Sequence, residues 1–173
     1  MPPPTRLDVF PAKQNTIAQI DEHCGGGMPP RPTKGMSLMT PEQLVSLAKE
    51  AMGHAYAPYS GYSVGAALLC ADGTVYQGCN IENASYTPTI CAERTAIFKA
   101  VYDGHRNFVA IAVCGGKDGV ITGAFPPCGV CRQVMREFCE DDFLIYMVTP
   151  EGYEAHTLAE ILPFSFSAKK HMQ

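Results

Sequence analysis

The sequence lacks the features of two large functional classes. No apolar run approaches the roughly 20 residues that a membrane-spanning helix needs, so we expect no membrane partner. Basic residues are few: Lys and Arg number 13 against 17 acidic residues, for a net charge of −4. A protein that binds a polynucleotide backbone instead gathers basic residues on one surface. These absences favour a small-molecule substrate and argue against a nucleic-acid partner.

A secretory signal is also missing from the first ten residues, which hold prolines, an arginine and an aspartate where an apolar segment would be needed. The eight cysteines therefore indicate metal binding or catalysis in a reducing compartment rather than a disulfide framework. We expect a cytoplasmic protein.

The composition divides the chain into two parts. Residues 1–37 are rich in proline and include the glycine triplet at 25–27. Such a segment has little apolar surface to bury, so it is predicted to be a flexible extension. Residues 38–173 are predicted to form one folded domain, since apolar residues make up 46% of the chain and charged residues 17%.

Helices and strands alternate along the predicted domain. Thr40, Pro41 and Gln43 form a capping-box pattern that starts a helix, which Gly53 ends. An apolar hairpin follows at 64–70 and 74–79, and buried strands are predicted at 108–114 and 143–148. Further helices are predicted at 91–101, 129–139 and 157–162. This order predicts an α/β fold with a mixed sheet between two helical layers, a three-layer α/β/α sandwich.

Three cysteines have the spacing of a metal site. Cys128 and Cys131 are three residues apart at the start of a predicted helix, where both can face the same side. Cys91 stands at the start of another helix, and free N–H groups at such positions favour thiolates. Thiolate ligands and tetrahedral geometry indicate zinc, and three protein ligands leave the fourth position open for catalysis. Glu93 can then carry protons beside the metal without binding it.

Other interpretations of these residues stay open at this point. A structural zinc site would need a fourth protein ligand, and no His or Cys is near in sequence. The Cys128-x-x-Cys131 spacing is also found in thioredoxin-like redox proteins, although there it follows an early strand. Arg94 either donates to the cysteine sulfurs and offsets their charge or is a solvated charge on a helix surface.

Several separated motifs together closely resemble the cytidine deaminases of the small, homotetrameric, three-cysteine zinc type. Cysteine-x-glutamate followed by proline-cysteine-x-x-cysteine resembles the general signature of zinc deaminases, with cysteine in the place of histidine. The resemblance runs from about residue 40 to the C-terminus and implies a central five-stranded mixed sheet. The segments that carry it are 57–60 (APYS), 64–67 (VGAA), 78–84 (GCNIENA), 91–96 (CAERTA) and 127–133 (PCGVCRQ).

The resemblance implies a function and a set of site residues. It implies zinc-dependent hydrolytic deamination of cytidine and 2′-deoxycytidine to uridine and 2′-deoxyuridine, with release of ammonia, in pyrimidine salvage. One Zn²⁺ per subunit would be held by the three cysteines, with Glu93 as the catalytic proton carrier and Arg94 beside the sulfurs. Active sites would be shared between subunits of a homotetramer. A deaminase of the same superfamily that acts on another cytosine nucleoside or on a polynucleotide stays an alternative. The implied substrate-binding residues are Asn80, Glu82, Tyr62 (usually phenylalanine in the family), Ala84, Tyr86 and Phe166.

Overall fold

The computed structural model describes residues 39–172, so the predicted extension at 1–37 lies outside the described residues. The first helix has the predicted start: the Thr40 side chain accepts from the backbone N–H of Gln43, and the Gln43 side chain accepts from the N–H of Thr40. The elements, in chain order, are α1 (Pro41–Met52), β1 (Tyr62–Cys70), β2 (Val75–Cys79), α2 (Ala92–Tyr102), β3 (Phe108–Lys117), α3 (Gly129–Phe138), β4 (Leu144–Thr149), β5 (Gly152–Thr157), α4 (Leu158–Ile161) and α5 (Ala168–His171).

The five strands form one mixed sheet in the order β2-β1-β3-β4-β5. β3 and β4 run parallel, and the other neighbours are antiparallel. The mixed five-stranded sheet is therefore confirmed. The residue pattern did not locate β5, because this edge strand is short and its side chains are mostly exposed or half-buried, so it has no apolar run to mark it.

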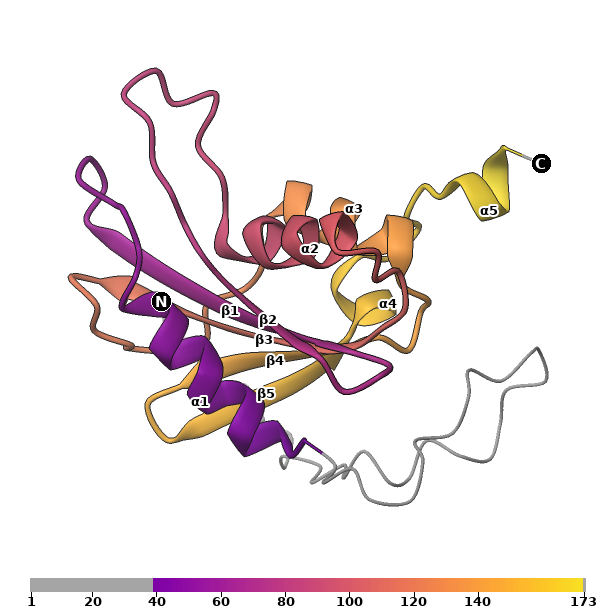
Figure 1. Cartoon of the computed structure of the whole chain (residues 1–173), viewed down its shortest axis with the longest axis horizontal. Coiled ribbons are helices and arrows are strands. Elements are labelled where there is room, and N and C mark those ends of the chain that lie inside the picture. Colours follow the sequence, from indigo (N-terminus) through magenta and orange to yellow (C-terminus); the bar gives the residue numbers. More distant parts are fainter. Residues whose placement is uncertain (1–38, 173) are drawn as a thin grey trace, which may run out of the picture.

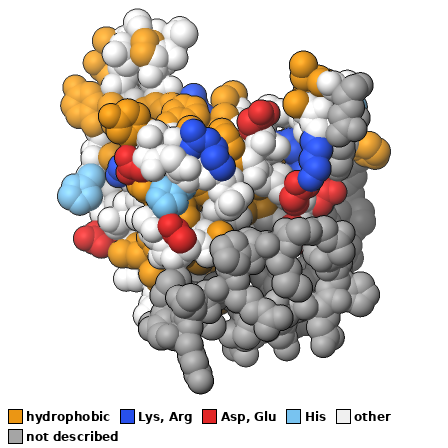
Figure 2. Space-filling model, turned by 45° about the vertical axis from the view of Figure 1, so that its right-hand side comes forward, with side chains coloured by type: hydrophobic (Ala, Val, Ile, Leu, Met, Phe, Trp, Pro, Cys, Tyr) orange, Lys and Arg blue, Asp and Glu red, His pale blue; other side chains and the backbone are white. Residues whose placement is uncertain are grey.

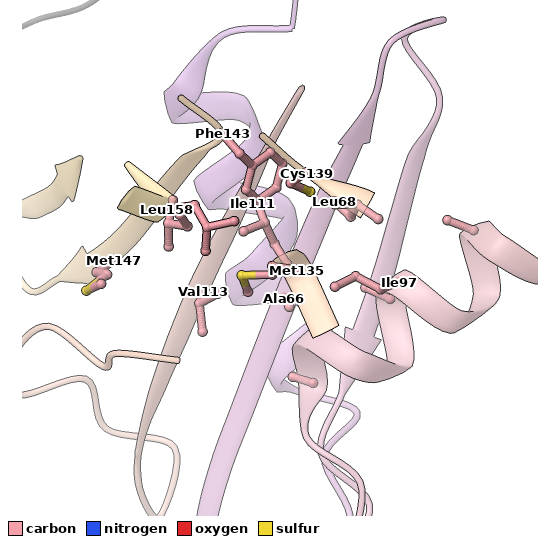
Figure 3. Close-up of a cluster of buried hydrophobic side chains, with 14 of the residues drawn as sticks. Ala66, Leu68, Ile97, Ile111, Val113, Met135, Cys139, Phe143, Met147 and Leu158 are labelled. Carbon is pink, nitrogen blue, oxygen red and sulfur yellow. The ribbon is translucent and has the colours of Figure 1, made fainter. Parts of the chain in front are cut away.

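Helices cover both faces of the sheet, which confirms the three-layer arrangement (Figure 1). The side chains of β1, β3 and β4 alternate between two separate cores, as the period of two in a strand requires. On one face α1 packs against β1 and β3, and on the other lie α2, α3 and α4. Figure 3 shows the core on the α2 and α3 side, where Ile97 of α2 and Met135 of α3 lie over Ala66 and Val113 of the sheet.

Gly78 allows α2 to approach β2 at backbone distance. A Cβ added at Gly78 would overlap the carbonyl oxygen of Ala92 and the amide nitrogen of Ala96. Both atoms belong to the first part of α2, so the missing side chain lets this end of the helix rest directly on the sheet. Gly78 therefore fixes the position of the helix start that carries Cys91 and Glu93.

The surface has no continuous basic track on the face in view in Figure 2, where Lys and Arg side chains are few and lie among acidic ones. Hydrophobic side chains gather at the upper left of the same face. Among the helices of residues 39–172, none combines the length and the apolar character needed to cross a membrane.

Candidate metal centre and active site

Three sulfur atoms from two helix starts converge on one point. Cys91 is the N-cap residue of α2 and Cys128 is the N-cap residue of α3, both with extended backbone. The Sγ atoms of Cys91 and Cys128 are 3.8 Å apart, and those of Cys128 and Cys131 are 3.5 Å apart. The three predicted ligands therefore lie together, although 37 residues separate the first from the second in the chain.

These distances match a tetrahedral zinc site. With Zn–S bonds of about 2.3 Å, two sulfur ligands of a tetrahedron lie about 3.8 Å apart. Within residues 39–172, the group contains these three cysteines and no fourth Cys, His, Asp or Glu ligand atom. The donor set thus fits zinc with one position left for a non-protein ligand, which argues against a purely structural site.

The charge state of the sulfurs also favours a cation among them. Donation from the Cys131 thiol, aided by Arg94 and opposed by burial, lowers the pKa of Cys91 to about 5. The pKa of Cys131 is raised in turn, first because its proton is shared with Cys91 and then because the thiol is buried. A metal ion among the three sulfurs would allow all of them to ionise together.

Arg94 supplies a second positive charge beside the trio. Its Nη2 atom lies 3.4 Å from the Cys91 sulfur and 3.5 Å from the carbonyl oxygen of Thr89. The guanidinium therefore donates to the Cys91 sulfur, and it is not a freely solvated surface charge. Such donation reduces the negative charge that three thiolates place on the metal.

Glu93 is buried in the first turn of α2, with 3% of its surface exposed. Burial raises the pKa of its carboxyl group to about 7, and the nearby Cys91 sulfur adds to the rise. The carboxyl also interacts with the Cys131 thiol. A carboxyl group whose pKa is near neutrality, beside a metal site, has the property that a general acid–base residue needs.

Arg132 holds the segment that leads into the second cysteine pair, a role that the sequence interpretation missed. Its Nε atom donates to the carbonyl oxygen of Pro127 at 2.7 Å, and Nη1 donates to the carbonyl oxygen of Ile161 at 2.8 Å. Pro127 directly precedes Cys128, so this clamp orients a candidate metal ligand. The residue stood inside the quoted motif, but its type alone does not reveal which carbonyl groups it binds.

Asn80 and Glu82 lie alongside the metal centre. Ile81, between them, forms two backbone hydrogen bonds of 3.0 Å with Ile90, the residue before Cys91. Glu82 accepts from the backbone N–H groups of Tyr59 and Ser60, and hydrogen bonding from Ser60 and Tyr59 lowers the pKa of its carboxyl group. The sequence motif therefore places an ionised carboxylate close to the candidate site.

The Asn80 side chain also has a structural task. Its Oδ1 atom accepts from the N–H of Val64 at 2.9 Å, and its Nδ2 atom donates to the carbonyl oxygen of Tyr62 at 2.8 Å. An amide group has four hydrogen-bonding positions in all, so one N–H and one lone pair stay available for a ligand. Asn80 thus fixes the start of β1, which carries Tyr62.

The Tyr62 ring contacts the segment that leads into Cys128. Its centre is 6.4 Å from the ring of Phe125, three residues before Cys128. The Tyr62 ring also contacts Lys117, whose ammonium group is 5.5 Å from the ring centre. The same ammonium group donates to the carbonyl oxygen of Ser60. Phe125 and Lys117 are neighbours of Tyr62 that no sequence motif indicated.

The remaining predicted substrate-binding residues lie on exposed segments. Ala84 and Tyr86 belong to the loop between β2 and α2, which projects from the top of the molecule in Figure 1, and the Tyr86 side chain is 72% exposed. Phe166 is anchored by Gln133 of α3, which donates to its carbonyl oxygen, and its ring stacks on His171. Within residues 39–172 neither residue is covered fully, since Phe166 is 57% exposed.

Comparison with known proteins agrees with this geometry. Residues 39–147 match the family model described as the cytidine and deoxycytidylate deaminase zinc-binding region. A cytidine deaminase of Sporosarcina psychrophila is 50% identical over 130 residues, which are 75% of this chain and 93% of that protein. A second, from Halalkalibacterium halodurans, is 48% identical over 76% of this chain and 97% of its own length.

Solved structures give the same result. The crystal structure of cytidine deaminase from Burkholderia pseudomallei has a TM-score of 0.68 at 44% identity, covering 74% of this chain and all (100%) of that one. Cytidine deaminase from Mycobacterium tuberculosis has a TM-score of 0.60 at 38% identity, covering 71% of this chain and 94% of its own.

Proposed function

The chain belongs to the cytidine and deoxycytidylate deaminase family, and from this we propose how its residues carry out zinc-dependent hydrolytic deamination of cytidine and 2′-deoxycytidine. The observation that carries the proposal is the trio of Cys91, Cys128 and Cys131 with the buried carboxyl group of Glu93 two residues along α2. Thioredoxin-like exchange uses a pair of cysteines, whereas here the pair shares its site with a third sulfur.

The three cysteines would hold the zinc ion. When bound, zinc supplies a Lewis acid that brings the pKa of a water molecule down toward ~7 and makes it a nucleophile. Arg94 donates to the Cys91 sulfur and so keeps the thiolate charge from weakening that effect. Arg132 holds the backbone before Cys128 in place.

Glu93 moves the protons. Its carboxylate takes a proton from the attacking water and gives it to N3 of the pyrimidine, which makes C4 electrophilic. After addition at C4, the same carboxyl group takes the remaining hydroxyl proton and passes it to the amino group, which leaves as ammonia. The product then has a carbonyl group at C4 and a proton on N3, as uridine has. Burial suits this role, because a carboxyl pKa near neutrality allows both steps.

Substrate recognition is assigned to the residues beside the trio. Glu82 and the free positions of the Asn80 amide would bind the ribose hydroxyl groups, which suits a carboxylate and an amide. The Tyr62 ring would pack on the pyrimidine, and the Lys117 contact would hold that ring in place. Free nucleosides fit this arrangement better than a polynucleotide, given the net charge of −4.

The exposed residues support an assembly with shared sites. We assign Ala84, Tyr86 and Phe166 to the site of a neighbouring subunit in a homotetramer. An apolar groove of about 510 Å³, lined by Ile81, Ile90, Phe98 and Tyr102 among others, lies beside the same loop. Exposed patches of this kind mark interaction surfaces. Light scattering after size-exclusion chromatography should give four times the mass of the chain, and a monomer with full activity would contradict shared sites.

The cysteine chemistry supports a cytoplasmic location. None of the seven cysteines among the described residues forms a disulfide bond, and reduced cysteines persist in reducing compartments. Fractionation of the source cells should find the activity with cytoplasmic marker enzymes.

The function is tested by the products and the substrate range of the purified protein. Zinc content and ammonia release should be measured with cytidine, 2′-deoxycytidine, free cytosine and a single-stranded oligonucleotide. We expect bound zinc and rapid release from the two nucleosides only. Release from the oligonucleotide at a comparable rate would instead favour the polynucleotide alternative.

A further inference from the structure

A second group of metal-ligand side chains lies far from the cysteine trio. Cys70 is the last residue of β1, Asp72 is in the turn to β2, and His105 follows the end of α2. Their ligand atoms all lie within 4.8 Å of one another. Because Cys91 caps one end of the 11-residue α2 and His105 lies beyond the other, about 16 Å of helix separates the two groups.

The geometry of this group fits a metal better than a simple ion pair. Nδ1 of His105 and Oδ2 of Asp72 are 3.3 Å apart, which is long for a charge-assisted hydrogen bond of about 2.7–2.9 Å. It is close to the separation of about 3.4 Å that a nitrogen and an oxygen have as ligands of one tetrahedral zinc. The other carboxylate oxygen accepts from the N–H of Thr74 at 3.0 Å, which fixes the orientation of the Asp72 side chain.

The surroundings combine a closed side and an open side. Cys70 is 1% exposed, whereas the side chains of His105 and Asp72 are 26% and 54% exposed. The Tyr76 ring lies 5.4 Å from the His105 ring and limits its movement. An ion can therefore enter past Asp72 and reach a sulfur whose burial gives it few other partners.

A divalent ion bound between these side chains would replace the thiol proton of Cys70, and its charge would be balanced by one thiolate and one carboxylate.

We propose that Cys70, Asp72 and His105 form a second zinc site, which ties the β1–β2 turn to the end of α2 and is separate from the catalytic centre. One sulfur, one imidazole nitrogen and one carboxylate oxygen make a ligand set typical of zinc, with water completing the tetrahedron. Its role is to stabilise the fold at this end of the sheet, where it would add to the backbone hydrogen bond from Ala71 to Asn107 that already joins the two segments.

The test is the zinc stoichiometry of the full chain and two histidine variants, saturated with zinc and then desalted. The wild-type chain should retain two equivalents and His105→Gln one. The matched control is His156→Gln, since His156 also contacts acidic side chains, Glu154 and Glu160, but no cysteine. The control should retain two. One equivalent in the wild-type chain, or two in His105→Gln, would overturn the proposal.

A cobalt titration tests the sulfur ligand independently of folding losses. Wild-type protein should show two steps of thiolate-to-cobalt absorption, and the weaker step, from one sulfur, should vanish in both His105→Gln and Cys70→Ser. Deamination of cytidine should stay at the wild-type rate in His105→Gln. Persistence of both steps in the two variants would refute the site, whereas loss of both would show that the variants disturb the catalytic trio instead.

Discussion

Replacing Asn80 with alanine should destabilise the protein as well as weaken substrate binding. The side chain is 8% exposed and connects to β1 through two hydrogen bonds, one from the Val64 N–H and one to the Tyr62 carbonyl oxygen. Removing the amide leaves both backbone groups without these partners. Each unsatisfied buried group costs about 1–3 kcal/mol, and the Tyr62 carbonyl bond is only part-buried, so the free energy of unfolding should fall by about 2–4 kcal/mol.

Urea denaturation at constant free zinc measures this change directly. In thermal unfolding the same loss should lower Tm by about 5–15 °C, using about 2–4 °C for each kcal/mol in a chain of this size. Asn83→Ala is the control, because its Oδ1 atom bonds only to Ser85 within an exposed loop, and it should change stability by less than about 0.5 kcal/mol. If Asn80→Ala were equally harmless, the structural role assigned to this amide would be wrong.

Three further predictions concern the helix start, the ribose contact and the metal. Gly78→Ala should displace α2 from β2 and lose zinc and activity together. Gly123→Ala should keep both, because an added Cβ there meets nothing within 4 Å. A normal zinc content in Gly78→Ala would contradict this. Glu82→Gln should raise KM more than it lowers kcat. Because the Glu82 pKa is lowered from 4.5, the ratio of the variant KM to the wild-type KM should stay constant from about pH 8 to about pH 5.5. It should shrink only when the pH falls through that lowered pKa. A ratio that shrinks above pH 5.5 would contradict an ionised ribose ligand. Cys128→Ala should lose one zinc equivalent by elemental analysis and about 100-fold or more in activity. Cys79→Ala removes a cysteine outside the trio and should retain its zinc. A full zinc content in Cys128→Ala would remove this residue from the ligand set.

Local sequence signals were sufficient for most of the fold. The capping box at Thr40 marked α1, and the apolar runs marked β1, β3 and β4, because a buried strand or helix start imposes a residue pattern on its own segment. β5 escaped this approach since its edge position allows polar side chains, and only the family resemblance implied a fifth strand. No sequence signal indicated that Arg132 of α3 would bind Pro127 and Ile161. Its partners there are backbone carbonyl groups, which every residue carries.

The candidate site followed the same division. The grouping of Cys91, Cys128 and Cys131, which the structure places together, could be predicted because their chemistry and spacing are specific. Contacts that depend on tertiary placement could not, and Lys117 beside Tyr62 is the clearest case, since a lysine at the end of a strand is ordinarily a solvated charge.

The central claim is that Glu93 carries protons beside a metal held by three cysteines, and Glu93→Gln tests it most directly. The amide keeps the size of the side chain but cannot take up a proton at neutral pH. The account predicts zinc content and cytidine affinity equal to those of the wild-type protein, with kcat reduced by about 10²–10⁴-fold. A variant with wild-type kcat would contradict it, as would a loss of activity that is fully explained by loss of zinc.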